Sequence, residues 1–525
     1  MSVRSRARWN PCKRGVSILG NFSLLRHLFL IWSLPGLWLV PALAGLNDLQ
    51  LRTLDGISRD KFTTRWIELS TNELASARRR AEGYLDGIRD HHLVDGLVVS
   101  VRYTDRTRTQ VDRYENLADS ALVTGLLLET HAIRFSTTRD DRDSVHGNPS
   151  LPAIRQLLTG VESLIRASGR DGYLARFVGR VDDPAYKPTY ERFGGPDPKR
   201  PGFGQLAYRG TNGATPVVWL GEPSREAYAA INLGLASTWQ QVRDASIRNR
   251  ASNIVCRILK RISDDGWQLN DGQGHVTFLT PSLTAALLRS GATIRPDLYG
   301  RLFESKIPDL LAQPAPGVVR YGENRAGVFN MLNLFSLWHF DTNVTRKIQY
   351  QDRLSQMWRE SSSHLNPLLA ISFVSCFDRP PNEPTALAVV QGAVAQFPDP
   401  PRWVSRQEGS ASTNRPTIKV NGEVWSRYAL PYDLRPVAPF QWAQSSYLIR
   451  GGEDAPIVHP GVDYLLLFWL GRESSMVQPE DAVTQVVSPL RLSRPNRTPG
   501  RTNLYSRTNS FLSNTNRALR PRLGP

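Results

Sequence analysis

Two pairs of acidic residues stand four positions apart in this chain of 525 residues. Glu115 and Asp119 open one strongly apolar run, and Glu222 and Glu226 open the next. Residues four apart lie on one face of a helix, so each pair is expected at a helix start, near one opening of the fold. Cleavage of a glycosidic bond needs an acid together with a base or nucleophile, and two carboxylates supply both. We therefore predict these four side chains as catalytic.

The same region also has a structural interpretation. Acids in a first turn favour the helix dipole, and Ser224 followed by Glu226 matches an ordinary helix-start signal. Tyr228 is a further catalytic candidate as a proton donor or stacking group, with core packing as the alternative. Asp463 is a third acidic candidate because it interrupts an apolar run. Its alternative is a salt bridge to Arg472 or to another helix.

Aromatic and arginine side chains near these helix starts are candidates for binding a substrate. A flat ring suits stacking on a sugar face, whereas a loop anchor packed on its own helix is the alternative. Arginine suits a bidentate contact with a uronate carboxylate. The predicted substrate-binding residues are Tyr173, Arg209, Trp219, Arg225 and Trp267.

Metal and cofactor motifs are missing from the sequence. It contains no CxxC, no HExxH and no cluster with metal-ligand spacing, so a zinc enzyme is disfavoured. None of the nine histidines falls in a motif, and His275, His339 and His459 receive no role. We expect neither a metal nor a cofactor.

Apolar residues recur with a helical period along most of the chain. Strongly apolar segments alternate with amphipathic ones, and two amphipathic segments end at similar Asp-Gly-aromatic turns around Gly172 and Gly266. Repetition of a helix pair is typical of a solenoid or a closed toroid. Residues 97–103 are expected as a short strand, and residues 177–221 as a long loop rich in Pro, Gly and aromatics. The expected helices are 58–92, 117–135, 151–165, 227–242, 247–262, 278–290, 295–311, 326–341, 345–361, 364–377, 384–397 and 461–472.

The two ends of the chain differ from its body. Residues 1–44 carry six basic residues without an acid, then an apolar run and the small-x-small pattern that a signal peptidase accepts. Cleavage after Ala44 is expected. A retained membrane anchor is the alternative, although the run contains Pro35 and falls short of the roughly 20 residues of a spanning helix. Residues 474–525 are dominated by Arg, Ser, Asn, Thr and Pro, and are expected to be a disordered basic tail.

The net charge of +17 does not indicate a nucleic-acid groove. Residues 1–44 contribute +6, and residues 476–525 contribute another +6 through eight Arg against two acids. The body is left at +5, which is nearly neutral for its size. We expect no nucleic-acid partner, and the Arg-rich tail is a candidate contact with an anionic envelope surface.

Alternating buried and amphipathic helices with a few long aromatic loops resemble the (α/α)6 toroid of the six-hairpin glycosidase group. That group includes unsaturated glucuronyl hydrolases, glucoamylase-like enzymes and alginate-type lyases. The segments Tyr114-Glu-Asn-Leu-Ala-Asp, Glu222-Pro-Ser-Arg-Glu-Ala-Tyr and Gly461-Val-Asp-Tyr-Leu-Leu also resemble uncharacterised secreted bacterial proteins of this type. The resemblance covers roughly residues 58–472 and is architectural. It implies an all-α chain of about six helical hairpins with long aromatic-rich loops, forming a single domain over residues 45–473.

The resemblance further implies an exported, periplasmic or extracellular, protein that acts on a carbohydrate. Hydrolysis or lyase cleavage of a polysaccharide or oligosaccharide, using the helix-start carboxylates, is the expected function. A non-catalytic toroid that binds glycan or envelope material is the first alternative, and an envelope-assembly protein is the second. A terpenoid cyclase on the same barrel is disfavoured because its aspartate-rich DDxxD cluster is missing.

Overall fold

The computed structural model describes residues 69–138, 149–194, 206–313, 324–377, 384–404, 416–420, 423–449 and 455–479. All of them lie in the first of two units of the chain, Met1–Pro479. The signal segment predicted for residues 1–44 and nearly all of the predicted tail lie outside the described residues.

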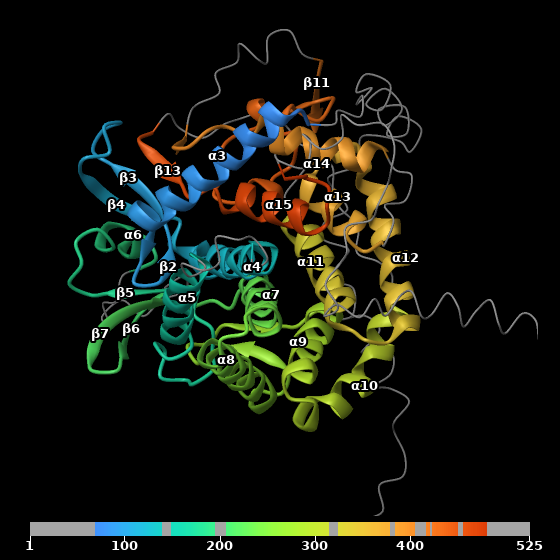
Figure 1. Ribbon diagram of the computed structural model, residues 1–525. Coiled ribbons are helices and arrows are strands. Elements are labelled where there is room, and N and C mark those ends of the chain that lie inside the picture. The colour runs from blue at the N-terminus through green and yellow to red at the C-terminus, as the bar shows by residue number, and fades with distance from the viewer. Residues whose placement is uncertain are drawn as a thin grey trace, which may run out of the picture. The chain divides into compact units, whose positions relative to one another are not determined.

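The described chain is mostly helical (Figure 1). Helices are present in all twelve ranges predicted from the apolar period. Of the helix predicted over 58–92, the structure describes only residues 69–92. The α-helices are α3 (Thr71–Gly87), α4 (Ser120–Thr138), α5 (Ser150–Leu164), α6 (Lys187–Glu191), α7 (Arg225–Gln241), α8 (Ala245–Asp264), α9 (Pro281–Ile294), α10 (Pro296–Ala312), α11 (Arg325–Phe340), α12 (Val344–Ser361), α13 (Pro367–Val374), α14 (Pro384–Gln396) and α15 (Val462–Glu473). Side-chain caps begin several of them, including α3, α7, α8, α9, α12 and α13.

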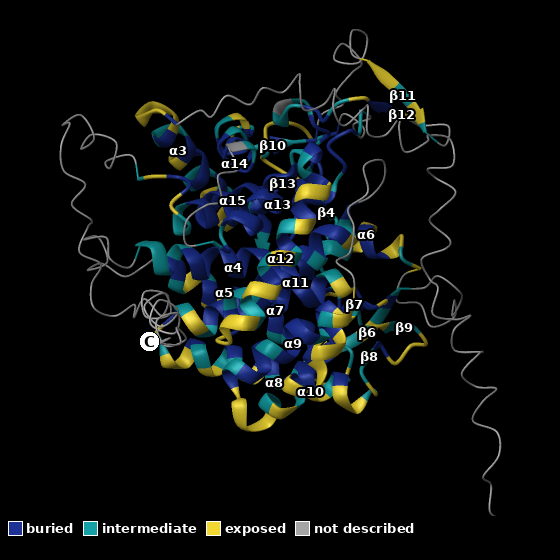
Figure 2. Cartoon of the chain, turned by 90° about the vertical axis from the view of Figure 1, so that its right-hand side faces the viewer, coloured by how far each residue is buried: buried dark blue, intermediate teal, exposed yellow. Residues whose placement is uncertain are grey.

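Buried and half-exposed helices pack in pairs. Helices α4, α7, α9, α11, α13 and α15 are buried along most of their length, and they lie in the interior of Figure 2. Among them α4 packs against α7 and α15, α7 against α9 and α11, and α13 against α11 and α15. Five of them have a partner next to them in sequence: α5 packs on α4, α8 on α7, α10 on α9, α12 on α11 and α14 on α13. The sixth, α15, is covered by α3 from the other end of the described chain.

Helices α4 and α7 approach each other closely because two glycines face the contact. A Cβ atom on Gly125 would lie 2.5 Å from the Ala230 carbonyl carbon. A Cβ atom on Gly234 would lie 2.4 Å from the Gly125 carbonyl oxygen. The two backbones therefore touch, and this contact fixes the starts of α4 and α7 side by side.

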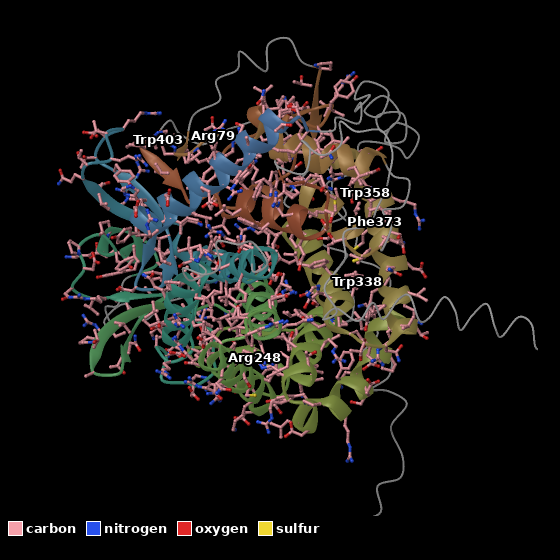
Figure 3. All side chains as sticks on the ribbon, in the orientation of Figure 1. Arg79, Arg248, Trp338, Trp358, Phe373 and Trp403 are labelled. Carbon is pink, nitrogen blue, oxygen red and sulfur yellow. The ribbon has the colours of Figure 1, made fainter. Side chains whose placement is uncertain are left out.

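Two aromatic rings pack between the outer helix α12 and the inner helix α13. Figure 3 shows Trp358 of α12 beside Phe373 of α13, and their rings stack with centroids 6.0 Å apart.

Among the described residues, no helix combines the length and apolar character needed to cross a bilayer.

The expectation of an all-α fold is corrected by a set of small antiparallel sheets. Four strands form the order β10-β13-β3-β4, three form β5-β7-β6, and three further sheets are two-stranded: β1-β2, β8-β9 and β11-β12. The strands are β1 (Leu93–Val94), β2 (Leu97–Val98), β3 (Ser100–Tyr103), β4 (Val111–Glu115), β5 (Phe177–Arg180), β6 (Ala207–Asn212), β7 (Thr215–Leu220), β8 (Gln268–Asn270), β9 (Val276–Phe278), β10 (Arg402–Trp403), β11 (Thr417–Val420), β12 (Glu423–Ser426) and β13 (Ile457–His459).

The segment expected as a long loop over residues 177–221 supplies the β5-β7-β6 sheet. Strands β6 and β7 form a hairpin whose turn begins at Gly213, with a φ of +62°. Asn-Gly followed by a run of β-branched and aromatic residues is a strong hairpin signal. The loop prediction relied on the Gly and Pro content of the segment and overlooked this signal. The sheet ends beside the start of α7, because Phe177 of β5 pairs with Leu220 of β7.

Candidate functional site

The starts of α4, α7 and α11 lie together and carry most of the polar side chains of interest. Helix α7 packs against both α4 and α11. The first turn of α4 is also tied to the β5-β7-β6 sheet, because the Ala121 amide donates to the Arg176 carbonyl at 2.9 Å. The Arg176 amide in turn donates to the Leu220 carbonyl at 3.0 Å, just before α7. We call this region, built on the three helix starts, the helix-start site.

Asp119 joins the start of α4 to the start of α11 in the helix-start site. It ends a short 3-10 turn, Leu117–Asp119, directly before α4. Both of its carboxylate oxygens accept hydrogen bonds from Arg325, the first residue of α11, at 2.8 Å each. The carboxylate is 13% exposed and the guanidinium 32%. A bidentate pair of this kind holds the carboxylate in one orientation while solvent still reaches it.

Glu222 lies in the turn between β7 and α7, and its backbone has an unusual conformation. Its φ is +58°, in the left-handed region that non-glycine residues seldom adopt. Arg176 fixes it from one side: the guanidinium donates to the Glu222 carbonyl at 2.6 Å and lies 3.4 Å from its carboxylate. The carboxylate itself is 49% exposed. Strain of this kind is retained only where the surroundings enforce it, and it is concentrated at functional sites.

A buried aspartate and a histidine hold Glu222 from the other side. The fully buried Asp271 accepts a hydrogen bond from the Glu222 amide at 3.1 Å. The same carboxylate oxygen lies 2.7 Å from Nδ1 of His275, whose ring is 32% exposed. Both residues belong to the turn of the β8-β9 hairpin, where Gly272 and Gly274 have positive φ. A carboxylate that binds Nδ1 orients the imidazole and leaves Nε2 for proton transfer.

The predicted pairing of Glu115 with Asp119 on one helix face is wrong. Glu115 is the last residue of strand β4, opposite Ser100 of β3. Asn116 then adopts a left-handed conformation with a φ of +59°, which separates the strand from the 3-10 turn. The Glu115 carboxylate binds three guanidinium groups instead, and its N–O distances are 2.8 Å to Arg113, 3.1 Å to Arg102 and 3.4 Å to Arg192.

The predicted pairing of Glu222 with Glu226 on one helix face is also wrong. Helix α7 begins at Arg225, and Ser224 caps it by accepting the Ala227 amide at 3.2 Å. Glu222 therefore precedes the helix, while Glu226 lies in its first turn and accepts a hydrogen bond from the Ser224 hydroxyl at 3.0 Å. The helix-start interpretation of Ser224 is confirmed. Arg225, a predicted substrate-binding residue, is exposed at the first position of α7.

Three predicted site aromatics are buried. Tyr173 and Trp219 are 0% and 1% exposed and pack edge to face at 5.9 Å. The Trp219 indole donates to the carbonyl of Arg209, whose own side chain is exposed on β6. Tyr228 is 2% exposed, and its hydroxyl accepts the Leu174 amide at 2.9 Å. Burial raises the pKa of both tyrosines. None of the three rings offers a face to a sugar; they anchor the sheet behind the site.

Trp267 is the predicted aromatic that does reach a pocket. It is the third residue after α8 and lines a pocket of about 230 Å³ together with residues of α9 and α10. A second pocket, of about 480 Å³, lies between α5 and the β5-β7-β6 sheet. No aromatic side chain is among the described residues that line this second pocket.

Asp463 has a structural partner. It is fully buried, and it accepts hydrogen bonds from Arg402 at 2.6 Å and from the Gln441 amide at 2.9 Å. The salt bridge expected for it therefore forms with strand β10, and neither Arg472 nor a helix supplies the partner. The Arg402 guanidinium also lies over the Phe397 ring, 4.7 Å from its centroid.

Four members of the helix-start site were missed from the sequence: Arg325, Arg176, Asp271 and His275. One signal pointed to the last two, because an aspartate four residues before a histidine in a Gly-rich turn can bind that histidine. Among the described residues, no group of three or more His, Cys, Asp or Glu side chains is placed to hold a metal ion. No protein-family model matches the chain, and no curated protein matches it either.

Proposed function

We propose that this protein is an exported carbohydrate-active enzyme that cleaves a polysaccharide or oligosaccharide at the helix-start site. The observation that carries the proposal is a pair of constrained carboxylates on segments joined through Arg176: Asp119, held by Arg325 just before Ala121, and Glu222, held by Arg176 and Asp271. Both remain in contact with solvent, as groups that act on an external substrate must be.

An (α/α)6 toroid is the proposed architecture. Its support is the packing of the buried helices, which runs from α4 through α7, α9, α11 and α13 to α15 and returns to α4. A sequence-adjacent partner for each of them except α15, which is covered by α3, matches six hairpins. In such a ring the inner helices start on the same side, which agrees with the location of Asp119, Arg325 and Glu226 at their helix starts.

Hydrolysis follows from the chemistry of two carboxyl groups. A protonated carboxyl donates its proton to the glycosidic oxygen as the C–O bond breaks. The other carboxylate takes a proton from the water that attacks the anomeric carbon. Glu222, half exposed and less tightly paired, fits the donor. Asp119, which accepts from a guanidinium through both oxygens, fits the acceptor.

Lyase cleavage is the second candidate, and the Asp271–His275 pair favours it. An imidazole oriented through Nδ1 can remove a proton next to a uronate carboxylate through Nε2. The C–O bond to the glycosidic oxygen then breaks as a double bond forms in the product, and the imidazolium gives its proton to the departing oxygen. The exposed Arg225 on α7 is available to bind the uronate carboxylate.

The test is product release by the chain from residue 45 to 475 on a panel of neutral and acidic polysaccharides. Reducing ends without unsaturated-uronate absorbance indicate hydrolysis, and both signals together indicate a lyase. Glu222→Gln and Asp119→Asn are each expected to lower the hydrolytic rate by about 100-fold or more while the melting temperature changes little. If the reaction is a lyase cleavage, His275→Gln is expected to lower its rate by about 100-fold or more.

A matched control is Glu304→Gln on α10, because Glu304 also forms an ion pair with an arginine, Arg346, at 2.8 Å. It is expected to keep full activity. Unchanged turnover in the Glu222 and Asp119 variants would exclude them as catalytic groups. A folded protein that releases no product from the whole panel would leave glycan binding without cleavage as the function.

A further inference from the structure

The pocket beside Trp267 lies away from the helix-start site. Its described lining comes from three places: Trp267 and Leu279 flank the β8-β9 hairpin, Pro281, Thr284 and Ala285 belong to the first turns of α9, and Lys306, Asp309 and Leu310 belong to α10. The lining therefore combines one aromatic ring and aliphatic side chains with a hydroxyl, an ammonium and a carboxylate.

Trp267 is held at this pocket in an unfavourable backbone conformation. Its φ is +64°, which is an outlier for a bulky residue. The amide of Trp267 donates to the Ile262 carbonyl at 2.8 Å and so helps to end α8, while Gly266 before it also has a positive φ. Glycine would satisfy this position at a lower conformational cost. The ring is only partly buried, so core packing does not account for a tryptophan here.

Two charged side chains at the pocket are available for a ligand. Lys306 and Asp309 are three residues apart on α10 and both are exposed. Within the described part of the chain, neither forms an ion pair or hydrogen bond with the protein, and nothing accepts from the Trp267 indole N–H. A flat ring beside one donor, one acceptor and a threonine hydroxyl matches a sugar, which has an apolar face and polar edges.

We infer that this pocket is a saccharide-binding subsite that takes one sugar ring of a longer chain. The Trp267 ring packs on the sugar face, while Lys306 donates to and Asp309 accepts from the hydroxyl groups at its edge. The same hairpin leads to the helix-start site: Asp271 follows Trp267 by four residues, which is roughly 13 Å of extended chain. A polysaccharide bound at both places would follow the hairpin. This inference rests on the proposed function for its ligand class.

Binding to a variant that cannot turn over separates this inference from the proposed function. The Glu222→Gln protein is run by affinity electrophoresis through gels that contain xylan, glucomannan, alginate or pectate. At least one polysaccharide is expected to retard it. Adding Trp267→Ala should weaken that binding by about tenfold or more, and adding Lys306→Ala should weaken it by a smaller factor.

Phe278→Ala is the matched control, because Phe278 is an aromatic residue of the same hairpin that is 70% exposed and does not line the pocket. Equal losses in the Trp267 and Phe278 variants, or no retardation by any of the four polysaccharides, would overturn the subsite. Trp267→Gly is a second variant. Because glycine adopts a positive φ without strain, a loss of binding in this variant reports the missing ring and not a misfolded turn. Binding that depends on Trp267, together with a natural protein that releases no product from any polysaccharide, would support the subsite and refute the cleavage reaction.

Discussion

The buried carboxyl group of Glu129 makes the stability of this protein depend on pH. Glu129 lies at the middle of α4 and is 3% exposed. Burial raises its pKa from the ordinary value of 4.5 to about 8, and the charge of Glu473 adds to the rise. The nearby Ser237 hydroxyl offsets part of this rise in pKa. It forms no hydrogen bond with the carboxyl group, so most of the rise remains. At neutral pH the folded protein therefore holds a proton here that the unfolded chain has released.

The sign of the effect follows from this difference in bound protons. Between pH 4.5 and pH 8 the folded state binds more protons than the unfolded state, so the free energy of unfolding falls as pH rises. Each pH unit in that window is equivalent to about 1.4 kcal/mol, and the whole window to about 5 kcal/mol. That is comparable with the entire stability of many domains, so the loss is measurable.

Glu129→Gln tests this reasoning, because the amide has the same shape and no charge. Urea unfolding followed by far-UV circular dichroism, in steps from about pH 5 to pH 8, gives the free energy of both proteins. The variant is expected to gain stability over the natural protein with rising pH, up to about 5 kcal/mol at pH 8. Glu73→Gln is the control: the hydrogen bond from Ser70 lowers the pKa of Glu73, so it does not titrate in this range. A difference between the Glu129→Gln variant and the natural protein that stays constant from pH 5 to pH 8 would refute the argument.

Two further predictions concern the packing that positions the helix-start site. Asp463→Asn leaves Arg402 buried without its charged partner and should cost roughly 3–5 kcal/mol in urea unfolding, whereas a loss below about 1 kcal/mol would show that water replaces the carboxylate. Gly125→Ala places a Cβ atom 2.5 Å from the α7 backbone and should cost about 1–3 kcal/mol or more. Gly87→Ala, which has nothing within 4 Å of the new atom, is the control and should be neutral or stabilising; equal effects would refute the close contact of α4 with α7.

The sequence alone determined the long helices and their order, whereas the five-residue α6 lies in the segment that was expected as a loop. Apolar positions with a period of 3.6 residues, caps such as Ser224 and Asp244, and glycines at the ends of α5 and α8 are local signals, and the structure has a helix wherever they occur together. It also indicated that Asp463 needs a partner, because a buried charge without one is too costly.

Strands were harder to predict because their stability comes from pairing with distant segments. Strand β3 pairs with both β4 and β13, and β13 lies more than 350 residues further along the chain. No local pattern encodes that neighbour. For this reason the chain was expected to be all-α, and the Glu115 strand was mistaken for the first turn of a helix.

The membership of the candidate site was decided by tertiary structure. Spacing along the sequence placed Glu115 with Asp119 and Glu222 with Glu226. The end of strand β4 separates the first pair, and the cap of α7 separates the second. Asp119 instead meets Arg325, which lies 206 positions away, and Glu222 meets Asp271, which lies 49 positions away. Sequence fixes which residue types are present and which local element carries them. The packing of α4, α7 and α11 decides which of those residues meet, because side chains from distant segments interact only once the helices that carry them are in contact.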